Sequence, residues 1–233
     1  MKTKEILTIC PSYGRPQRLT KMIESFLETS CRSDLSVWVN ADDPCFSDYY
    51  KIRNWYFKIG APVMFCCVST TMTITQMFNS AANLEGYSFY HQTNDDFIYK
   101  TIGWDAKFIN KLSEFGEGIV YGNDLVQGKN LPTAQFISAG IIRALGWIQL
   151  PSLTHLGNDC VWKEIGSRIK RLFYMEDVII EHQHWMKNKS LIDTVYQRTN
   201  SQQMYDKDQR VYRQWFHQQM DKDVERIKSL CKI

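Results

Sequence analysis

The sequence of 233 residues lacks a long hydrophobic run, so we expect no membrane span. Its most apolar stretch, residues 136–150, is interrupted by Arg143, whereas a transmembrane helix needs roughly 18 consecutive apolar residues. The few apolar residues that follow the polar start are too short a run for the hydrophobic region of a signal peptide. These absences predict a cytoplasmic protein.

The seven cysteines lack any pairing pattern. Their number is odd, there is no C-x-x-C motif, and none has metal-ligand spacing to the five histidines. We therefore expect buried free thiols in a reducing compartment and no structural zinc site. Repeats and low-complexity tracts are also absent, and 44% hydrophobic residues predict one globular domain, with or without an appendage.

The known phosphate-binding loops are missing as well. The sequence has no G-x-G-x-x-G and no Walker A lysine motif, which excludes the usual dinucleotide and P-loop cradles. A bound diphosphate would instead have to be neutralised by a metal ion. Adjacent carboxylates at the end of a strand can hold such a hard cation.

Positive charge is unevenly distributed along the chain. Residues 1–185 contain 18 Lys and Arg against 19 Asp and Glu, a net charge of −1, whereas residues 186–233 contain 10 against 6, a net of +4. A solvated helix of mixed charge is the commoner cause of such a segment. A surface that binds nucleic-acid phosphates is the alternative.

The first 122 residues alternate between strand-like runs and amphipathic helical stripes. Strands are predicted at 6–10, 35–40, 62–69, 86–92 and 118–121, and helices at 16–27, 47–59, 74–82 and 104–112. This order predicts an α/β fold with an open, mostly parallel sheet and helices on both faces.

Beyond Gly122 the regular alternation ends. One short apolar segment within residues 123–160 is compatible with either strand or helix. We expect a helix from about Asp159, strands at 171–175 and 178–182, and a terminal helix or helix pair from Met204.

Turns rich in polar residues follow three of the predicted strands, at the edge where open α/β sheets bind ligands. They are Pro11, Ser12, Tyr13, Gly14, Arg15 and Pro16 after the first, Asp42 and Asp43 after the second, and Asn94, Asp95 and Asp96 after the fourth. Taken singly, Asp42 and Asp43 could be ordinary turn residues, and Asp95 and Asp96 could cap a following helix. Their recurrence after successive strands favours a binding site.

The second half adds an acid and two histidines. Asp159 lies near a predicted helix N-terminus, where it is either an N-cap or a general base. His182 and His184 stand two residues apart on a predicted strand, so both rings share one face and could complement carboxylates around Mn²⁺. His155, close in sequence to Asp159, is a further candidate.

In this order these residues resemble GT-A fold glycosyltransferases, similar to the inverting family 2 and especially to its small phage and bacterial members. The resemblance spans residues 6–200. It implies donor contacts from Pro11, Ser12, Tyr13, Arg15, Asp42, Asp43, Asn94 and Asp95, metal binding by Asp96 with His182 or His184, and acceptor or sugar contacts from Gly140, Trp147 and His155. Asp159 would be the catalytic base. The triplet 94–96 is D-x-D-like but departs from a strict D-x-D, because its first residue is Asn.

The resemblance also implies an organisation and a reaction. A GT-A domain would occupy residues 1–200, with a nucleotide-sugar-binding half at 1–122 and an acceptor and catalytic half at 123–200, followed by a helical tail at 201–233. With Mn²⁺ or Mg²⁺ the protein would move a sugar from a nucleotide-sugar donor, a UDP-sugar, to an acceptor hydroxyl with inversion. The acceptor would be a glycan or a 5-hydroxymethylpyrimidine in phage DNA, the latter placing the protein in the host cytoplasm.

Two other functions compete with this interpretation. A nucleotidyltransferase on a related sheet needs a glycine-rich, lysine-bearing loop after its first strand, and Tyr13-Gly14-Arg15 is not such a loop. A non-catalytic module that binds carbohydrate or nucleic acid has no need of a general base such as Asp159.

Overall fold

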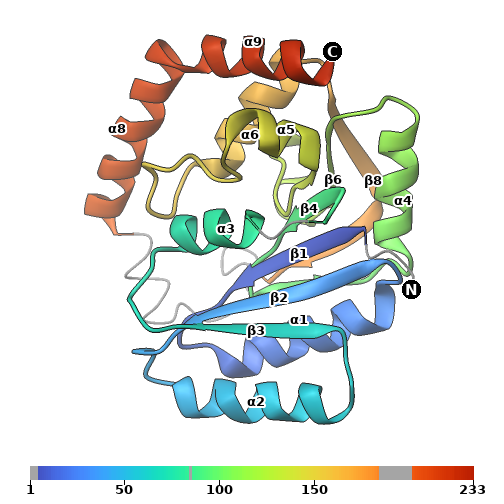
Figure 1. The fold of residues 1–233 in the computed structure, drawn as a ribbon, viewed down its shortest axis with the longest axis vertical. Coiled ribbons are helices and arrows are strands. Elements are labelled where there is room, and N and C mark those ends of the chain that lie inside the picture. Colours follow the sequence, from blue (N-terminus) through green and yellow to red (C-terminus); the bar gives the residue numbers. More distant parts are fainter. Residues whose placement is uncertain (1–4, 84–85, 184–200) are drawn as a thin grey trace.

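A computed structural model describes residues 5–83, 86–183 and 201–233 of the chain. Its strands form an eight-stranded sheet in the order β3-β2-β1-β4-β7-β6-β8-β5 (Figure 1). The strands are β1 (Ile6–Pro11), β2 (Ser33–Asn40), β3 (Val63–Val68), β4 (Phe89–Gln92), β5 (Phe97–Tyr99), β6 (Ile119–Asn123), β7 (Phe136–Ser138) and β8 (Leu172–His182). The first four pair in parallel, whereas β7 runs antiparallel to its neighbours β4 and β6.

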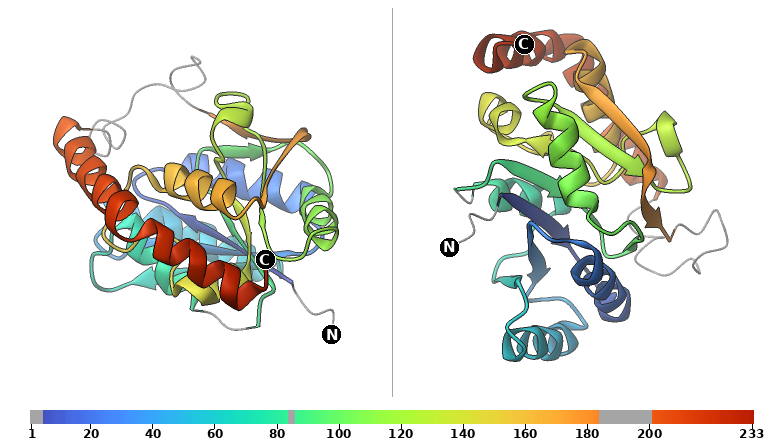
Figure 2. Two further views of the ribbon diagram at one scale, coloured as in Figure 1. Left: turned by 90° about the horizontal axis from the view of Figure 1, so that it is seen from above. Right: turned by 90° about the vertical axis from the view of Figure 1, so that its right-hand side faces the viewer.

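Helices cover both faces of this sheet, as predicted (Figures 1 and 2). One face carries α1 (Pro16–Thr29), α2 (Phe46–Lys58) and α4 (Trp104–Ser113), and the other carries α3 (Ile74–Ala82), α5 (Ala139–Leu145) and α6 (Asn158–Arg168). A short 3-10 turn, η1 (Gly128–Asn130), follows β6. None of the helices within the described ranges has the length and apolar character needed to cross a bilayer.

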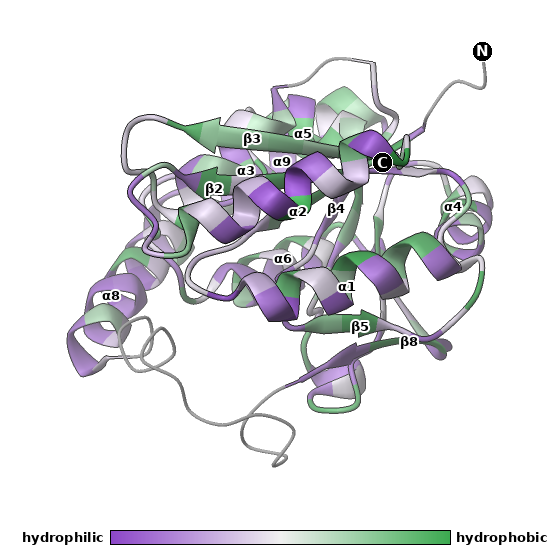
Figure 3. Ribbon diagram, turned by 90° about the horizontal axis from the view of Figure 1, so that it is seen from below, coloured by the Kyte–Doolittle hydropathy of each residue, from purple (hydrophilic) through white to green (hydrophobic). Residues whose placement is uncertain are grey.

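Alternation along β1 explains why the sheet has two cores. Leu7 and Ile9 point into the core beneath α3, α5 and α6, whereas Ile6 and Cys10 point into the core beneath α1, α2 and α4. In α1 the buried positions include Leu19, Met22, Ile23 and Phe26, which is the predicted stripe, and its polar side faces outward (Figure 3).

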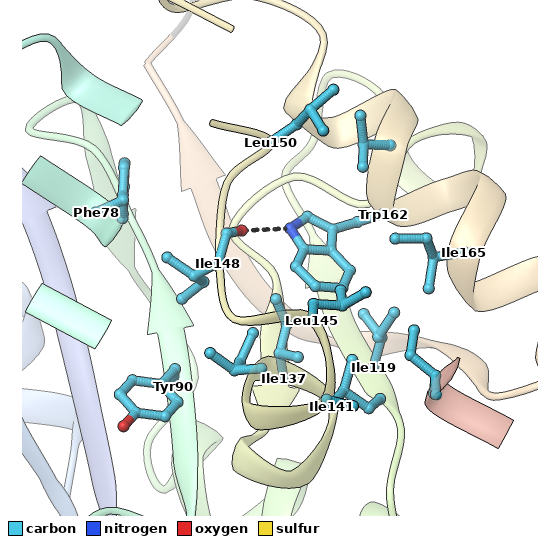
Figure 4. Packing of buried hydrophobic residues seen from close by; sticks show 14 of the residues in the cluster. Phe78, Tyr90, Ile119, Ile137, Ile141, Leu145, Ile148, Leu150, Trp162 and Ile165 are labelled. Carbon is cyan, nitrogen blue, oxygen red and sulfur yellow. Dashed lines mark hydrogen bonds between the residues drawn. The ribbon is translucent and has the colours of Figure 1, made fainter. Parts of the chain in front are cut away.

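Trp162 of α6 lies at the centre of the first of these cores (Figure 4). It packs among Ile119, Ile137 and Ile141 from the sheet and α5, and its indole Nε1 donates to the Ile148 carbonyl at 3.0 Å. That bond satisfies the one polar atom of a buried tryptophan. The helix that contains Asp159 is therefore firmly attached to the sheet.

The C-terminal segment forms the predicted helix pair, α8 (Gln202–Gln218) and α9 (Met220–Cys231). Trp215, Met220, Val224 and Ile227 join the same core as Trp162, and α9 lies along α5 and α6 (Figure 2). The helix pair thus shares a hydrophobic core with elements that precede residue 200.

The structure corrects two local predictions and resolves a third that the sequence leaves open. The segment 171–182 is one strand, β8, which pairs in parallel with β6 and then antiparallel with β5. The ambiguous apolar segment is a strand followed directly by a helix, β7 and α5. None of the seven cysteines forms a disulfide, but only Cys10 is buried as expected: Cys31 and Cys67 are exposed, and the other four are half-buried.

The crossing of β6 and β8 requires a glycine. Register shifts between Gly122 and Asn123, and a Cβ atom at position 122 would lie 2.4 Å from the Val178 carbonyl oxygen. No side chain fits at that separation, so Gly122 allows β8 to pass close to β6.

Candidate active site

A pocket of about 600 Å³ opens at the carboxyl ends of β1, β2 and β4, beside the start of α6. This is the edge at which open α/β sheets bind ligands. Among the predicted site residues, the following line it: Pro11, Ser12, Tyr13, Arg15, Asp42, Asn94, Asp95, Asp96, His155, Asp159 and His182. Segments far apart in the sequence therefore meet in one cavity.

Arg15 faces the acidic turn that follows β4. Its guanidinium Nη1 lies 3.6 Å from Asp95 Oδ1 and 3.9 Å from Asp96 Oδ2, and all three side chains are largely shielded from solvent. A cation held next to two carboxylates is partly neutralised. It remains positioned to meet the additional negative charge of a bound diphosphate.

A chain of hydrogen bonds fixes Asp95 to the end of β1. The Arg15 amide donates to the Tyr49 oxygen at 2.9 Å, Tyr49 and Ser12 hydroxyls lie 2.8 Å apart, and Ser12 Oγ donates to Asp95 Oδ2 at 2.7 Å. Because the carboxylate only accepts, the Ser12 proton points to Asp95 and the Tyr49 proton points to Ser12. Burial raises the pKa of Tyr49, which keeps this hydroxyl protonated.

The pKa values of the two adjacent aspartates are shifted in opposite directions. Burial, reinforced by the charge of Asp96, raises the pKa of Asp95. Burial acts in the same direction on Asp96, but the neighbouring His182 imidazole and Arg15 outweigh it and lower the pKa of Asp96. Asp96 is thus the carboxylate that stays ionised, as a metal ligand must.

Asp96 and His182 offer two ligand atoms of the types that Mn²⁺ and Mg²⁺ sites use. His182 Nε2 lies 3.5 Å from Asp96 Oδ1, a buried oxygen that accepts no hydrogen bond within the described ranges, and the imidazole stacks on the Phe97 ring at 4.5 Å. No cluster of three or more potential ligands occurs in the part of the chain that the structure describes. Two protein ligands suit a cation whose other positions are taken by phosphate oxygens and water. His184, the other predicted ligand, lies outside the described residues.

Asp159 lies in the first turn of α6, but it is not the helix cap. Gly157, with φ of +90°, takes the N-cap position, and no side chain caps the helix. Instead the Asp159 carboxylate accepts a hydrogen bond from Gln135 Nε2. Burial raises the pKa of Asp159 to about 6; Gln135 and His182 act against this rise, and Asp124 adds to it. A carboxylate that titrates near neutrality is well suited to act as a general base.

The two aspartates after β2 have different positions. Asp43 is buried outside the pocket and accepts from the amides of Gly14 at 2.8 Å and Cys45 at 2.7 Å, which is the turn role that its sequence context allows. Asp42 is exposed at the pocket and accepts from Thr71 Oγ1 at 2.6 Å. Asn94 is also exposed there.

Gly140 and Trp147 are not brought to the pocket. Gly140 lies in α5, where an added Cβ would meet the Glu117 carboxylate at 2.2 Å. Trp147 is half-buried, with its ring 5.7 Å from that of Trp162. Trp147 therefore packs against the hydrophobic core, away from the pocket where a sugar contact is expected.

Several residues that shape the site have no local signal in the sequence. Gln135 lies 24 positions from Asp159, and Tyr49 lies 37 positions from Ser12. Asp124 is buried and accepts from the amides of residues 126–128 and from Thr133 Oγ1, which fixes a loop along the pocket. Among these contacts, only the bonds from the amides of residues 126–128 to Asp124 follow a familiar short-range pattern, the Asp-initiated turn.

No family model matches the sequence, and a sequence search of curated proteins finds no match. Solved structures do match. S. aureus TarS 1-349 in complex with UDP superposes with a TM-score of 0.60 at 9% identity, over 76% of this chain and 59% of that chain. The mannosyltransferase PcManGT from Pyrobaculum calidifontis, in complex with GDP-Man and Mn²⁺, superposes with a TM-score of 0.62 at 10% identity, over 97% of this chain and 73% of that chain.

The chain has a GT-A-like fold. S. aureus TarS 1-349 has also been solved with UDP-GlcNAc, and that structure matches with a TM-score of 0.58 at 9% identity, over 76% of this chain and 57% of that chain. The GT-A-like chain thus spans less than two thirds of the length of these TarS chains. At such low identity the likeness is one of fold.

Proposed function

We propose that this chain is a metal-dependent glycosyltransferase that moves a sugar from a nucleotide-sugar donor, a UDP-sugar, to an acceptor hydroxyl with inversion. The observation that carries the proposal is the meeting of Arg15, the Asp95–Asp96 pair and Asp159 in one pocket of a GT-A-like sheet. A binding module would need the first three groups, but not a buried carboxylate with a pKa of about 6.

On the donor side, Asp96 and His182 would hold Mn²⁺ or Mg²⁺. When bound, the cation supplies positive charge that stabilises the departing diphosphate. Arg15 supplies a second, fixed cation at the same place. Asp95, held by Ser12, would accept hydrogen bonds from the donor ribose, and Pro11, Tyr13, Asp42 and Asn94 would surround the nucleoside.

On the acceptor side, Asp159 would take the proton of the attacking hydroxyl. The acceptor oxygen forms a bond to the anomeric carbon from the face opposite the diphosphate. The bond from that carbon to the diphosphate oxygen breaks, and its electron pair leaves with the nucleoside diphosphate. This single displacement inverts the configuration. Gln135 orients the carboxylate, and His155 lies along the same wall.

A panel of UDP- and GDP-sugars, incubated with Mn²⁺ and assayed for hydrolysis, tests the reaction. We expect turnover of at least one donor and a loss of about 10²–10⁴-fold in kcat for Asp159→Asn, because general base catalysis contributes that much. Glu164→Gln, on the same helix but outside the pocket, is the matched control. Inactivity with every donor would remove the enzyme proposal, and full activity of Asp159→Asn would remove the assignment of the base.

For the acceptor we propose a 5-hydroxymethylpyrimidine in phage DNA, with a glycan as the second candidate. The DNA proposal is supported by α8, which lines the pocket at Met204 and carries Arg210 and Arg213 on its exposed side. Lys187 and Lys189, which also belong to the basic segment, lie outside the described residues. Cations beside the pocket could contact the phosphates that flank a modified base.

A gel-shift titration with duplex DNA at increasing salt separates the two acceptors. We expect binding at low salt that weakens steeply with salt, and weaker binding for Arg210→Ala with Arg213→Ala. Lys228→Ala, an exposed cation on α9, is the control. Absence of any duplex affinity at low salt would leave the glycan as acceptor.

A further inference from the structure

Asp208 is the only side chain in the first half of α8 that is buried, with 1% of its surface exposed. Its carboxylate accepts three consecutive backbone hydrogen bonds. Oδ1 accepts from the Thr154 amide at 2.9 Å, and Oδ2 accepts from the amides of His155 at 2.8 Å and Leu156 at 2.7 Å. Successive amides that converge on one anion form a tight, directional clamp.

The clamped segment leads directly into the candidate base. Residues 154–157 line the pocket, Gly157 turns the chain with φ of +90°, and α6 begins with Asn158 and Asp159. Residues 154–156 belong to none of the helices or strands in the described ranges, so no regular backbone hydrogen bonding holds this loop. A carboxylate that accepts from three successive amides therefore fixes the loop that leads into the first turn of α6.

Apolar packing does not account for the position of this part of α8. Trp215 near its C-terminal end is buried in the core, together with Met220 and Val224 of α9. Residues 202–210 contribute no side chain to that core, and Met204 lines the pocket instead. The N-terminal half of α8 is thus held against the pocket through Asp208.

We propose that Asp208 is a positioning residue for the acceptor side of the pocket. Through the amides of residues 154–156 it sets the placement of His155 and Asp159, and it makes α8 one wall of the acceptor site. The part of this inference that concerns catalysis rests on the proposed function, whereas the clamp itself does not.

Asp223 of α9 provides a matched control. It is also a buried carboxylate in the C-terminal helix pair, and it accepts from Trp215 Nε1 at 2.8 Å and Gln219 Nε2 at 3.0 Å. None of these partners lines the pocket. Asp223→Asn therefore perturbs the helix pair without releasing the loop at 154–156.

Hydrogen–deuterium exchange tests the clamp without any substrate. We expect the amides of residues 154–156 to be protected in the unmodified protein, to exchange at least tenfold faster in Asp208→Asn, and to be unchanged in Asp223→Asn. Free exchange of these amides in the unmodified protein would overturn the proposal. That measurement requires no variant, so it decides the question even if Asp208→Asn fails to fold.

Kinetics then separate positioning from general stability. The assay uses Mn²⁺ and a UDP-sugar that the unmodified protein hydrolyses. We expect Asp208→Asn to lower kcat at least tenfold while the Kd for UDP stays within twofold. We expect Asp223→Asn to retain the original kcat. Equal losses in both variants would show a general effect of helix docking and overturn the positioning role. If the unmodified protein neither binds UDP nor hydrolyses any donor, the proposed function fails, and the exchange result still decides the clamp.

Discussion

Backbone amides are the main partners of Asp43, Asp124 and Asp208, although Asp124 also accepts from the Thr133 hydroxyl, whereas side chains of the pocket are the partners of Asp95 and Asp159. This difference separates the acids by role. A carboxylate saturated by main-chain N–H groups fixes a loop and has little capacity left for a substrate. A carboxylate that meets one or two side chains keeps lone pairs for a ribose or a proton.

The pH dependence of turnover should report Asp159. Burial raises the pKa of its carboxyl from 3.8 to about 6, against the influence of Gln135 and His182, so the basic form is lost at a higher pH than for an exposed aspartate. We expect kcat/KM for donor hydrolysis to fall as the pH drops through about 6. A rate that is constant down to about pH 5 would contradict this assignment.

The raised pKa of Asp159 also predicts how ionisation of this carboxyl changes the free energy of unfolding. A raised carboxyl pKa means that the folded protein holds the proton more tightly than the unfolded chain, so ionisation above about pH 6 costs free energy of folding. Asp159→Asn should therefore retain or increase the free energy of unfolding at about pH 8, while it loses activity. Urea unfolding of both proteins measures this difference.

Tyr49→Phe should loosen the turn after β1. The change removes the hydroxyl between the Arg15 amide and Ser12 in a side chain that is 1% exposed. We expect the free energy of unfolding to fall by about 1–3 kcal/mol, because two buried polar groups lose their partner. UDP binding should weaken as Ser12 and Asp95 lose their fixed geometry.

Tyr50→Phe is the control for that variant. Tyr50 is the next residue of α2 and is 50% exposed, so the loss of its hydroxyl should change the free energy of unfolding by less than about 0.5 kcal/mol. Similar losses in both variants would show that the hydrogen-bond chain through Tyr49 does not stabilise the turn.

At the scale of elements, periodicity alone predicted most helices and strands. The stripe in α1 and the alternation in β1 depend on residues close in sequence, so a local pattern contains the needed information. β5 was missed because three residues show no period, and β8 was divided because its middle residues, Glu176 and Asp177, are exposed and charged. Its pairing with both β6 and β5 overrides that local polarity.

The candidate site was predictable in part for the same reason. Residues directly after strands, such as Arg15 and Asp96, follow from the position of each strand. The partners of Asp159 and of the loop before it do not, since Gln135 and Asp208 form their hydrogen bonds across 24 and 52–54 positions of sequence. Such contacts depend on how the helices pack, which no local pattern encodes.

Packing of α9 gives an element-scale prediction. Ile227 is 0% exposed in the core shared with α5 and α6, whereas Leu230, on the same helix, is 63% exposed. Ile227→Ala should lower the free energy of unfolding by about 2–5 kcal/mol, and Leu230→Ala by less than about 0.5 kcal/mol, as measured in urea. Equal and small effects would mean that α9 is a loosely attached appendage.

For the whole molecule, the distribution of charge matters more than its sum. The net charge of +3 combines a near-neutral body of −1 with a C-terminal segment of +4. Asp42, Asp95, Asp96 and Asp159 of the body line the pocket, whereas α8 beside it carries the exposed Arg210 and Arg213.

Thermal unfolding should reveal donor and metal binding together. UDP at about 100 times its Kd should stabilise the folded state by about 2.7 kcal/mol, which corresponds to a rise in Tm of roughly 5–10 °C for a chain of this size. We expect EDTA to abolish most of this shift, and Asp96→Asn to do the same, because Asp96 is the ionised candidate ligand.

Asp48→Asn, a change of an exposed acid on α2, should leave the UDP-induced shift intact. A shift that is independent of metal and unaltered in Asp96→Asn would contradict the proposed metal site, while leaving nucleotide binding itself demonstrated.

The close approach of β8 at Gly122 limits which residues position 122 can accept as the sequence diverges. β8 passes it at the Val178 carbonyl and ends four residues later at His182, beside Asp96. Any side chain at 122 would push the strand away and carry the histidine with it. Homologous chains that preserve this crossing must therefore keep glycine there, even where divergence has replaced every residue that lines the pocket.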